Sequence, residues 1–182
     1  LMKAVGTGDS AGLQEAIQTA FDQFRTSLNA SEGGTPLFGG SQVDQVPFSV
    51  DTLAQAATTP GASAFHNDTV RANARVADGV DISYGVGASE IGANLYEAFR
   101  TLGQAGDIGT KPTDAQMDAI KQAVAQLNTV LGDVRAINAD NGRKQNQVDT
   151  LTARGEARGL VLQGVIQDNE DADHGQVAID LA

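Results

Sequence analysis

The sequence predicts a mainly α-helical protein, a long antiparallel helical bundle or rod with a small insertion that contains a β-hairpin. Two segments near opposite ends of the chain carry apolar residues at spacings of three and four, which is typical of amphipathic helices. Between them, apolar and polar residues alternate on both sides of Asp78-Gly79, a pair typical of two-residue hairpin turns. We therefore expect one helical body built from residues 1–46 and 111–182, and a mixed α/β insertion at residues 47–110.

The first amphipathic segment begins near Asp9 or Ser10, either of which can cap a helix, and runs to about residue 30. Its apolar stripe consists of Leu13, Ile17, Phe21, Phe24 and Leu28. A helix of this length is marginal in water unless its apolar face packs on something. The expected partner is the apolar stripe of the C-terminal segment.

The C-terminal segment, residues 113–170, begins at a strong start signal. Thr113 and Gln116 have the spacing of a capping box, in which each side chain accepts a hydrogen bond from the other residue's amide. The stripe that follows consists of Ile120, Val124, Leu127, Leu131 and Val134. No proline follows Pro112, so the most favourable place for a kink or a split into two helices is Gly142. A continuous helix would span about 87 Å, too long for the interior of one small domain.

Beyond Ile137 the stripe becomes polar, and it turns apolar again from Val148. Basic side chains accompany this polar stretch: Arg135, Arg143, Lys144, Arg154 and Arg158. Two interpretations stay open. The side chains are either an ordinary solvated face or partners for acidic side chains on neighbouring copies of the protein.

Composition excludes several classes of function. The 182 residues include no cysteine, so the chain forms neither a disulfide nor a zinc–thiolate site. The net charge of −11 argues against binding to nucleic acid or to an anionic membrane surface. No apolar run is long enough to span a bilayer, and no cleavable signal peptide is recognisable. Because the chain begins at Leu1-Met2, we expect a piece of a longer protein.

We find no convincing catalytic, cofactor or metal site. Gly8-Asp9-Ser10, together with Asp171 and His174, resembles the motifs of one class of serine esterase, but such enzymes need a parallel sheet that the sequence does not predict. The acidic residues at 168–173 lack the spacing of a calcium-binding loop. His66 and His174 have no third ligand at metal-binding spacing. We therefore expect no enzyme activity, no cofactor and no metal.

Three motifs, taken in order, resemble the flagellin and hook–filament junction protein family of bacteria. The first is the turn from Asn29 to Ser41, which contains Leu37-Phe38-Gly39-Gly40, a form nearer to the junction protein than to filament flagellin. The second is Gly142-Arg143-Lys144-Gln145-Asn146-Gln147-Val148, and the third is Glu170-Asp171-Ala172-Asp173. The resemblance implies a helical body like the D1 domain of flagellin.

The resemblance also implies a non-enzymatic structural subunit that is exported without a cleavable signal peptide and assembles outside the cell. The implied partners are other flagellar subunits (hook-associated proteins and flagellin) and an export chaperone. The family's terminal helices are not recognisable here, so we expect the isolated chain to be monomeric. The residues expected to face neighbouring subunits are Arg135, Arg143, Lys144, Gln145, Asn146, Arg154 and Arg158. The alternative is a helical ligand-sensing or adhesive extracellular domain, which saturable binding of a small ligand would favour.

Overall fold

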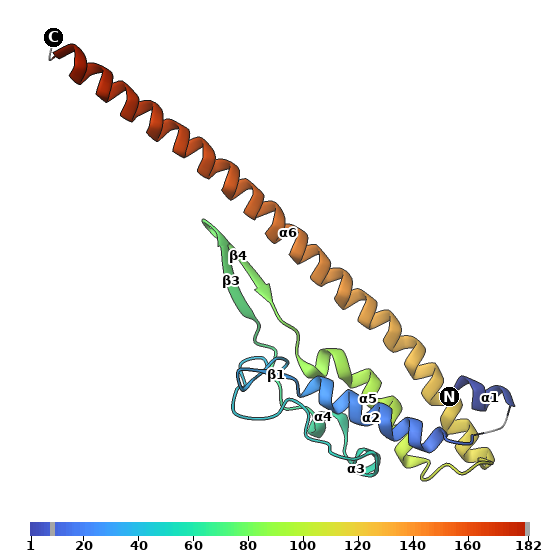
Figure 1. The fold of residues 1–182 in the computed structure, drawn as a ribbon. Helices are drawn as coiled ribbons and strands as arrows, with labels where there is room; N and C mark the ends of the chain where they lie inside the picture. The colour runs from blue at the N-terminus through green and yellow to red at the C-terminus, as the bar shows by residue number, and fades with distance from the viewer. Residues whose placement is uncertain (8–9, 181–182) are drawn as a thin grey trace. The chain divides into compact units, whose positions relative to one another are not determined.

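A computed structural model describes residues 1–7 and 10–180, with the side chains of residue 4 and residues 171–180 left undescribed. The protein is mostly helical, with 63% of its residues in helices and two small antiparallel hairpins (Figure 1). It divides into two units, each of which is described by itself. The first comprises Leu1–Ala72 and Ser83–Ala139, and the second comprises Asn73–Ile82 and Asp140–Ala182.

The elements are labelled in Figure 1. In chain order they are α1 (Met2–Thr7), α2 (Leu13–Leu28), β1 (Ser31–Glu32), β2 (Thr35–Pro36), α3 (Leu53–Thr58), α4 (Gly61–Ala64), β3 (Ala72–Ala77), β4 (Val80–Tyr84), α5 (Ala88–Gln104) and α6 (Asp114–Asp180). Strand β1 pairs with β2, and β3 pairs with β4.

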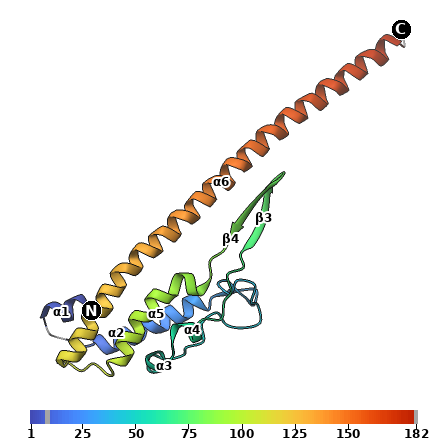
Figure 2. The ribbon, with the colours of Figure 1, turned by 180° about the vertical axis from the view of Figure 1, so that it is seen from behind.

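The core of the first unit is an aromatic cluster that joins α2 to residues predicted to lie in the insertion. Figures 1 and 2 both show α2 and α5 side by side. Phe48, from the extended segment before α3, has its ring centroid 5.2 Å from that of Phe24 on α2 and 5.3 Å from that of Tyr96 on α5. Phe99 of α5 lies 5.3 Å from Phe21. Residues predicted to lie in the insertion therefore share a core with α2, because these rings bury one another.

Helix α2 begins at Leu13, after Gly12 in a left-handed conformation with φ of 73°. Ser10 does not act as the expected cap, because its buried hydroxyl donates a hydrogen bond to the carbonyl oxygen of Gly109 instead. Asp9, the other candidate cap, lies outside the described residues. Ser10 thereby ties the start of α2 to the loop before α6.

Helix α6 confirms the predicted capping box. The amide of Thr113 donates to Gln116 Oε1 at 3.0 Å, and the amide of Gln116 donates to Thr113 Oγ1 at 3.3 Å. The helix continues without interruption to Asp180, so the split considered at Gly142 does not occur. A glycine within a helix costs only about 1 kcal/mol relative to alanine, which is too little by itself to end a helix.

Both hairpins close with glycine-containing two-residue turns. The predicted turn at Asp78-Gly79 is confirmed, with Gly79 at a φ of 70°. For the β1–β2 hairpin, the sequence indicates only a turn between Asn29 and Ser41. Here Ser31 lies opposite Pro36 and Glu32 lies opposite Thr35, with Gly33 and Gly34 at positive φ. Adjacent residues with positive φ are typical of the type I′ turns that favour short hairpins.

Candidate functional site

The residues expected to pack the two helical stripes together all lie in the first unit. The stripe of α2 is buried along its whole length: Leu13, Ile17, Phe21, Phe24 and Leu28. On α6, Ile120 is buried, whereas Val124 and Leu127 are half-buried. Both stripes therefore contribute to the same side-chain cluster over the first part of α6.

The second half of the α6 stripe was predicted wrongly. Leu131 is 53% exposed and Val134 is 37% exposed, while Ala123 and Val130 are buried instead. The reason lies in polar contacts with α5, which a count of apolar residues cannot detect. Thr101 Oγ1 donates to Gln126 Oε1 at 3.2 Å, and Asn94 Nδ2 donates to Asp133 Oδ2 at 2.8 Å. These contacts turn the line of residues 123, 126, 130 and 133 toward α5 and leave Leu131 and Val134 outside.

An apolar groove of about 440 Å³ lies between α2, α5 and the first part of α6. From α2 it is lined by Leu13, Ala16, Ile17, Ala20, Gln23, Phe24 and Ser27; from α5 by Leu95, Ala98, Phe99 and Leu102; and from α6 by Leu127, with Leu1 at the side. Gln23 and Ser27 are the polar members of this lining. Such a lining suits an apolar partner surface better than a reaction that needs converging polar groups.

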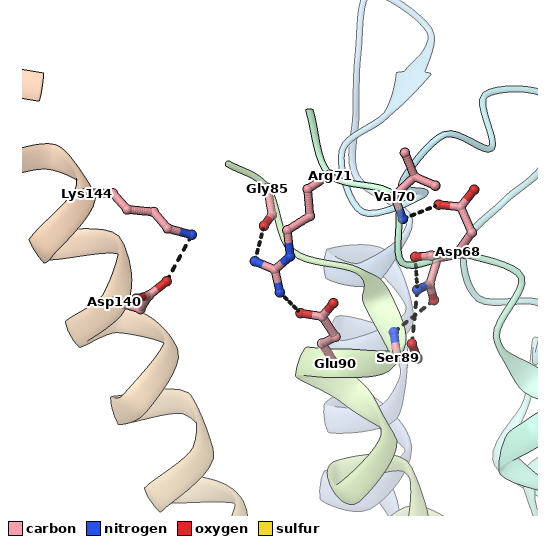
Figure 3. Close-up of polar contacts among 9 residues, drawn as sticks. Asp68, Val70, Arg71, Gly85, Ser89, Glu90, Asp140 and Lys144 are labelled. Carbon is pink, nitrogen blue, oxygen red and sulfur yellow. Dashed lines mark hydrogen bonds and ion pairs between the residues drawn. The ribbon is translucent and has the colours of Figure 1, made fainter. Parts of the chain in front are cut away.

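A second feature of the first unit is a polar clasp at the loop that follows β2. Asp68 accepts hydrogen bonds from the amide of Ser41 (2.9 Å), from the Ser41 hydroxyl, from Gln42 Nε2 (3.2 Å) and from the amide of Val70 (3.0 Å). Figure 3 shows the carboxylate of Asp68 directed at the amide of Val70. The hydrogen bond from the Ser41 hydroxyl, followed by that from the Ser41 amide, holds the pKa of Asp68 well below its usual range.

The clasp explains the glycines of the Leu37-Phe38-Gly39-Gly40 motif. Gly40 has a φ of 68°, and a Cβ atom at this position would overlap the carboxylate of Asp68. A Cβ atom at Gly39 would overlap the carbonyl oxygen of Gln42. A side chain at either position would therefore break the turn that brings Ser41 to Asp68.

The neighbouring Asn67 extends the clasp to the start of α5. Its Oδ1 accepts a hydrogen bond from the amide of Ser89 at 2.9 Å, and its Nδ2 donates to the hydroxyl of Ser89 at 3.0 Å. The carbonyl oxygen of Phe38 accepts from the amide of Ala88 at 2.9 Å. These contacts satisfy amides at the helix start, and α5 therefore begins at Ala88.

We expect Asp68→Asn to lower the melting temperature at neutral pH. A carboxylate with a depressed pKa stabilises the folded state above its unfolded pKa of about 3.9, and this contribution is lost as the pH falls further. The difference in melting temperature between the native protein and Asp68→Asn should therefore narrow from pH 6 toward pH 3. Thermal unfolding followed by circular dichroism across this range tests the expectation, and a difference that stays constant or widens on acidification contradicts it.

The predicted subunit-interface residues lie on α6. Some of them form ion pairs within this helix, and others form none among the described residues. Arg143 and Lys144 pair with Asp140 of their own helix at 3.1 Å and 2.9 Å, and Figure 3 shows the Lys144 contact. The hydrogen bond and charge of Lys144, with a smaller effect of Arg143, lower the pKa of Asp140. The exposed members of the set are Arg135, Arg143, Gln145, Asn146, Arg154 and Arg158. Within the described part of the chain, Arg135, Arg154 and Arg158 form no ion pair.

The esterase motif finds no support in the part of it that can be described. Ser10 is 3% exposed and its hydroxyl is engaged with a backbone carbonyl, so it is not placed to attack a substrate. Gly8, Asp9 and the side chains of Asp171 and His174 lie outside the described residues. Over the described residues, no cluster of three acidic or histidine side chains is arranged to hold a metal ion. No described helix combines the length and the apolar character needed to cross a bilayer.

The fold is that of a mainly helical protein in which an N-terminal helix and hairpin, a middle segment with a second hairpin, and a long C-terminal helix follow in order. Among solved structures, it is similar to the crystal structure of Bacillus cereus FlgL, with a TM-score of 0.64 and 15% sequence identity. The similarity covers 86% of this chain and 73% of the FlgL chain. Neither a protein-family model nor a curated protein matches the sequence. At this identity, the comparison establishes a FlgL-like fold.

Proposed function

We propose that this protein is a structural subunit of the bacterial flagellum, of the hook-associated kind, and that it acts by packing against other flagellar subunits. The observation that carries the proposal is the fold shared with FlgL, a flagellar hook-associated protein, over 86% of the chain. In the assembled state, α6 would run within a long antiparallel helical bundle. The proposed location is outside the cell, after export without a cleavable signal peptide.

The surface of the second unit supports a role in assembly. Part of α6 exposes an apolar run to solvent, and more than half of each of its large side chains is exposed. They are Leu160 (71%), Val161 (67%), Leu162 (54%), Val165 (52%) and Ile166 (57%). Contiguous exposed apolar surface of this kind marks interaction sites. Hook-associated proteins, flagellin and an export chaperone are the proposed partners.

The clasp favours a hook–filament junction protein over a filament flagellin. The Leu37-Phe38-Gly39-Gly40 motif resembles the junction protein, and both glycines occupy positions where a side chain would overlap neighbouring atoms. The turn therefore requires both glycines of the motif.

The groove in the first unit favours a second candidate, a ligand-sensing or adhesive domain. Its volume of about 440 Å³ lies within the range of small-molecule pockets, about 300–1,000 Å³. Most such pockets also present polar groups that orient the ligand, and Gln23 and Ser27 are the polar side chains available in this lining. Saturable binding of an apolar small molecule, abolished by Ala20→Trp, would favour this candidate.

Immunogold electron microscopy of the source bacterium, with antibodies raised against this chain, tests the proposed function. For a junction protein, we expect gold particles where the hook meets the filament. Gold along the whole filament would identify a flagellin and would contradict the junction assignment. Labelling of the cell surface away from flagella would overturn the flagellar proposal as a whole. Cells that lack the gene supply the control for antibody specificity.

A further inference from the structure

We propose that the apolar groove of the first unit binds α6 residues 155–166 of a second copy of this chain. The inference rests on the proposed function, since it names the surfaces through which a self-assembling subunit would contact its own copies. It joins two observations, a groove that no described element covers and an apolar helix face that no described element covers.

The helix face has the shape needed to enter a groove between helices. Gly155, Gly159, Leu162 and Ile166 recur at spacings of three and four, so they form one stripe on α6. A Cβ atom at Gly155 or Gly159 would meet no neighbouring atom within 4 Å, so the fold itself does not need glycine there. Each glycine nevertheless costs the helix about 1 kcal/mol. Close approach of a partner helix gives these glycines a role.

The groove offers a complementary surface on α2. Ala16, Ala20, Gln23 and Ser27 also recur at spacings of three and four, and all four are exposed. Two alanines and a serine let a partner helix approach closely, while Phe24 and the α5 side chains supply an apolar floor. The leucine and isoleucine of the α6 stripe would fill this space.

Charge complementarity points to a second copy as the occupant. Glu15 and Asp22 are exposed on the outer side of the α2 stripe, seven positions apart, and neither forms an ion pair with a described residue. Arg154 and Arg158 are exposed beside the α6 stripe and are likewise unpaired within the described residues. The long side chains of Arg154 and Arg158 can reach the acidic edge of α2, formed by Glu15 and Asp22, when the α6 stripe enters the groove. A chain with a net charge of −11 would otherwise repel its own copies.

The contact joins two different surfaces, so it is heterologous, and a copy bound through its groove still has its own α6 stripe to offer to a further copy. Its ion pairs lie at the edge and are screened by salt, with a Debye length of about 8 Å at physiological ionic strength. We therefore expect monomers in dilute solution, in agreement with the sequence-based expectation. In concentrated solution at low salt, we expect association that proceeds beyond dimers.

Sedimentation equilibrium of the 182-residue chain tests the inference. At low salt, the average mass should rise above that of the 18.8 kDa monomer as the concentration increases. Leu162→Asp with Ile166→Asp should abolish this rise without changing the melting temperature, because both side chains are exposed. Ala20→Trp should do the same by filling the groove.

Charge reversal tests the pairing itself. Arg154→Glu with Arg158→Glu should weaken association about tenfold, and so should Glu15→Lys with Asp22→Lys. The variant that carries all four substitutions should regain association, because the charges are exchanged rather than removed. Glu32→Lys with Asp44→Lys is the matched control, since both residues are exposed and lie outside the two surfaces.

Any of three results would overturn the inference: a chain that stays monomeric at every concentration, association that survives the apolar substitutions, or association that is not restored in the fourfold variant. The proposed function is tested independently by gold labelling. If the chain stays monomeric but the antibody labels the junction, the proposed contact is wrong and the flagellar role stands. If the chain associates as expected but the antibody labels no flagellum, the flagellar role is wrong instead.

Discussion

Replacing Phe48 by alanine should destabilise the first unit by about 3–5 kcal/mol, the usual cost of removing a buried phenylalanine side chain. Phe48 is 1% exposed, and its ring lies 5.2 Å from Phe24, 5.2 Å from Phe65 and 5.3 Å from Tyr96. Its removal leaves a cavity at the point where α2, α5 and the segment before α3 meet. Denaturant unfolding followed by circular dichroism measures the change.

Leu37→Ala is the matched control for Phe48→Ala. Leu37 is 51% exposed, so its truncation should change the free energy of unfolding by no more than about 0.5 kcal/mol. If Phe48→Ala has an equally small effect, then the aromatic cluster is not the core of the first unit. Residues 47–110 would in that case behave as a separate insertion, as the sequence predicted.

Replacing Ile120 by aspartate should unfold the first unit, whereas replacing Leu131 by aspartate should leave its stability nearly unchanged. Ile120 is fully buried, and an unpaired carboxylate in its place costs several kcal/mol. Leu131 is 53% exposed, so an aspartate there stays in water. The two positions belonged to one predicted stripe, and the comparison therefore tests which line of α6 faces the core.

The measurement is the melting temperature of each variant, with Val130→Asp as a third. Val130 is 6% exposed and adjoins Leu131 in sequence, so Val130→Asp should behave like Ile120→Asp. Stability lost at Leu131 and retained at Val130 would mean that the stripe predicted from the sequence is the buried one. The three melting temperatures thus show which face of α6 is buried, and they require no substitution elsewhere in the chain.

Local signals were sufficient where the energy that fixes an element is itself local. The Thr113–Gln116 capping box joins residues three positions apart, and the Asp78-Gly79 turn joins adjacent strands. The five-residue stripe of α2 is also local, because the 3.6-residue period alone places its members on one face. Each of these features needs no knowledge of what lies elsewhere in the fold.

The candidate surfaces were harder to predict, because exposure depends on every element that covers a residue. The basic residues of α6 were recognised as a group, yet the sequence did not separate Arg143 and Lys144, which pair with Asp140, from Arg154 and Arg158, which are unpaired within the described residues. The apolar groove has no sequence signature at all, since its lining comes from α2, α5 and α6 together. A binding role for the acidic edge of α2 can be inferred only once the groove is known to lie beside it.

The sequence by itself determined that the protein is mainly helical and which residues of α2 form its buried face. It also determined that α6 starts at the Thr113–Gln116 capping box, and where the β3–β4 hairpin turns. The tertiary structure alone decided that α5 begins at Ala88, where Asn67 and Phe38 reach its first amides, and that α6 turns Ala123 and Val130 inward. The physical reason is the range of the forces involved. Backbone hydrogen bonds and apolar periodicity act over a few residues, whereas a polar contact such as Asn94 with Asp133 joins side chains that only the completed fold brings together.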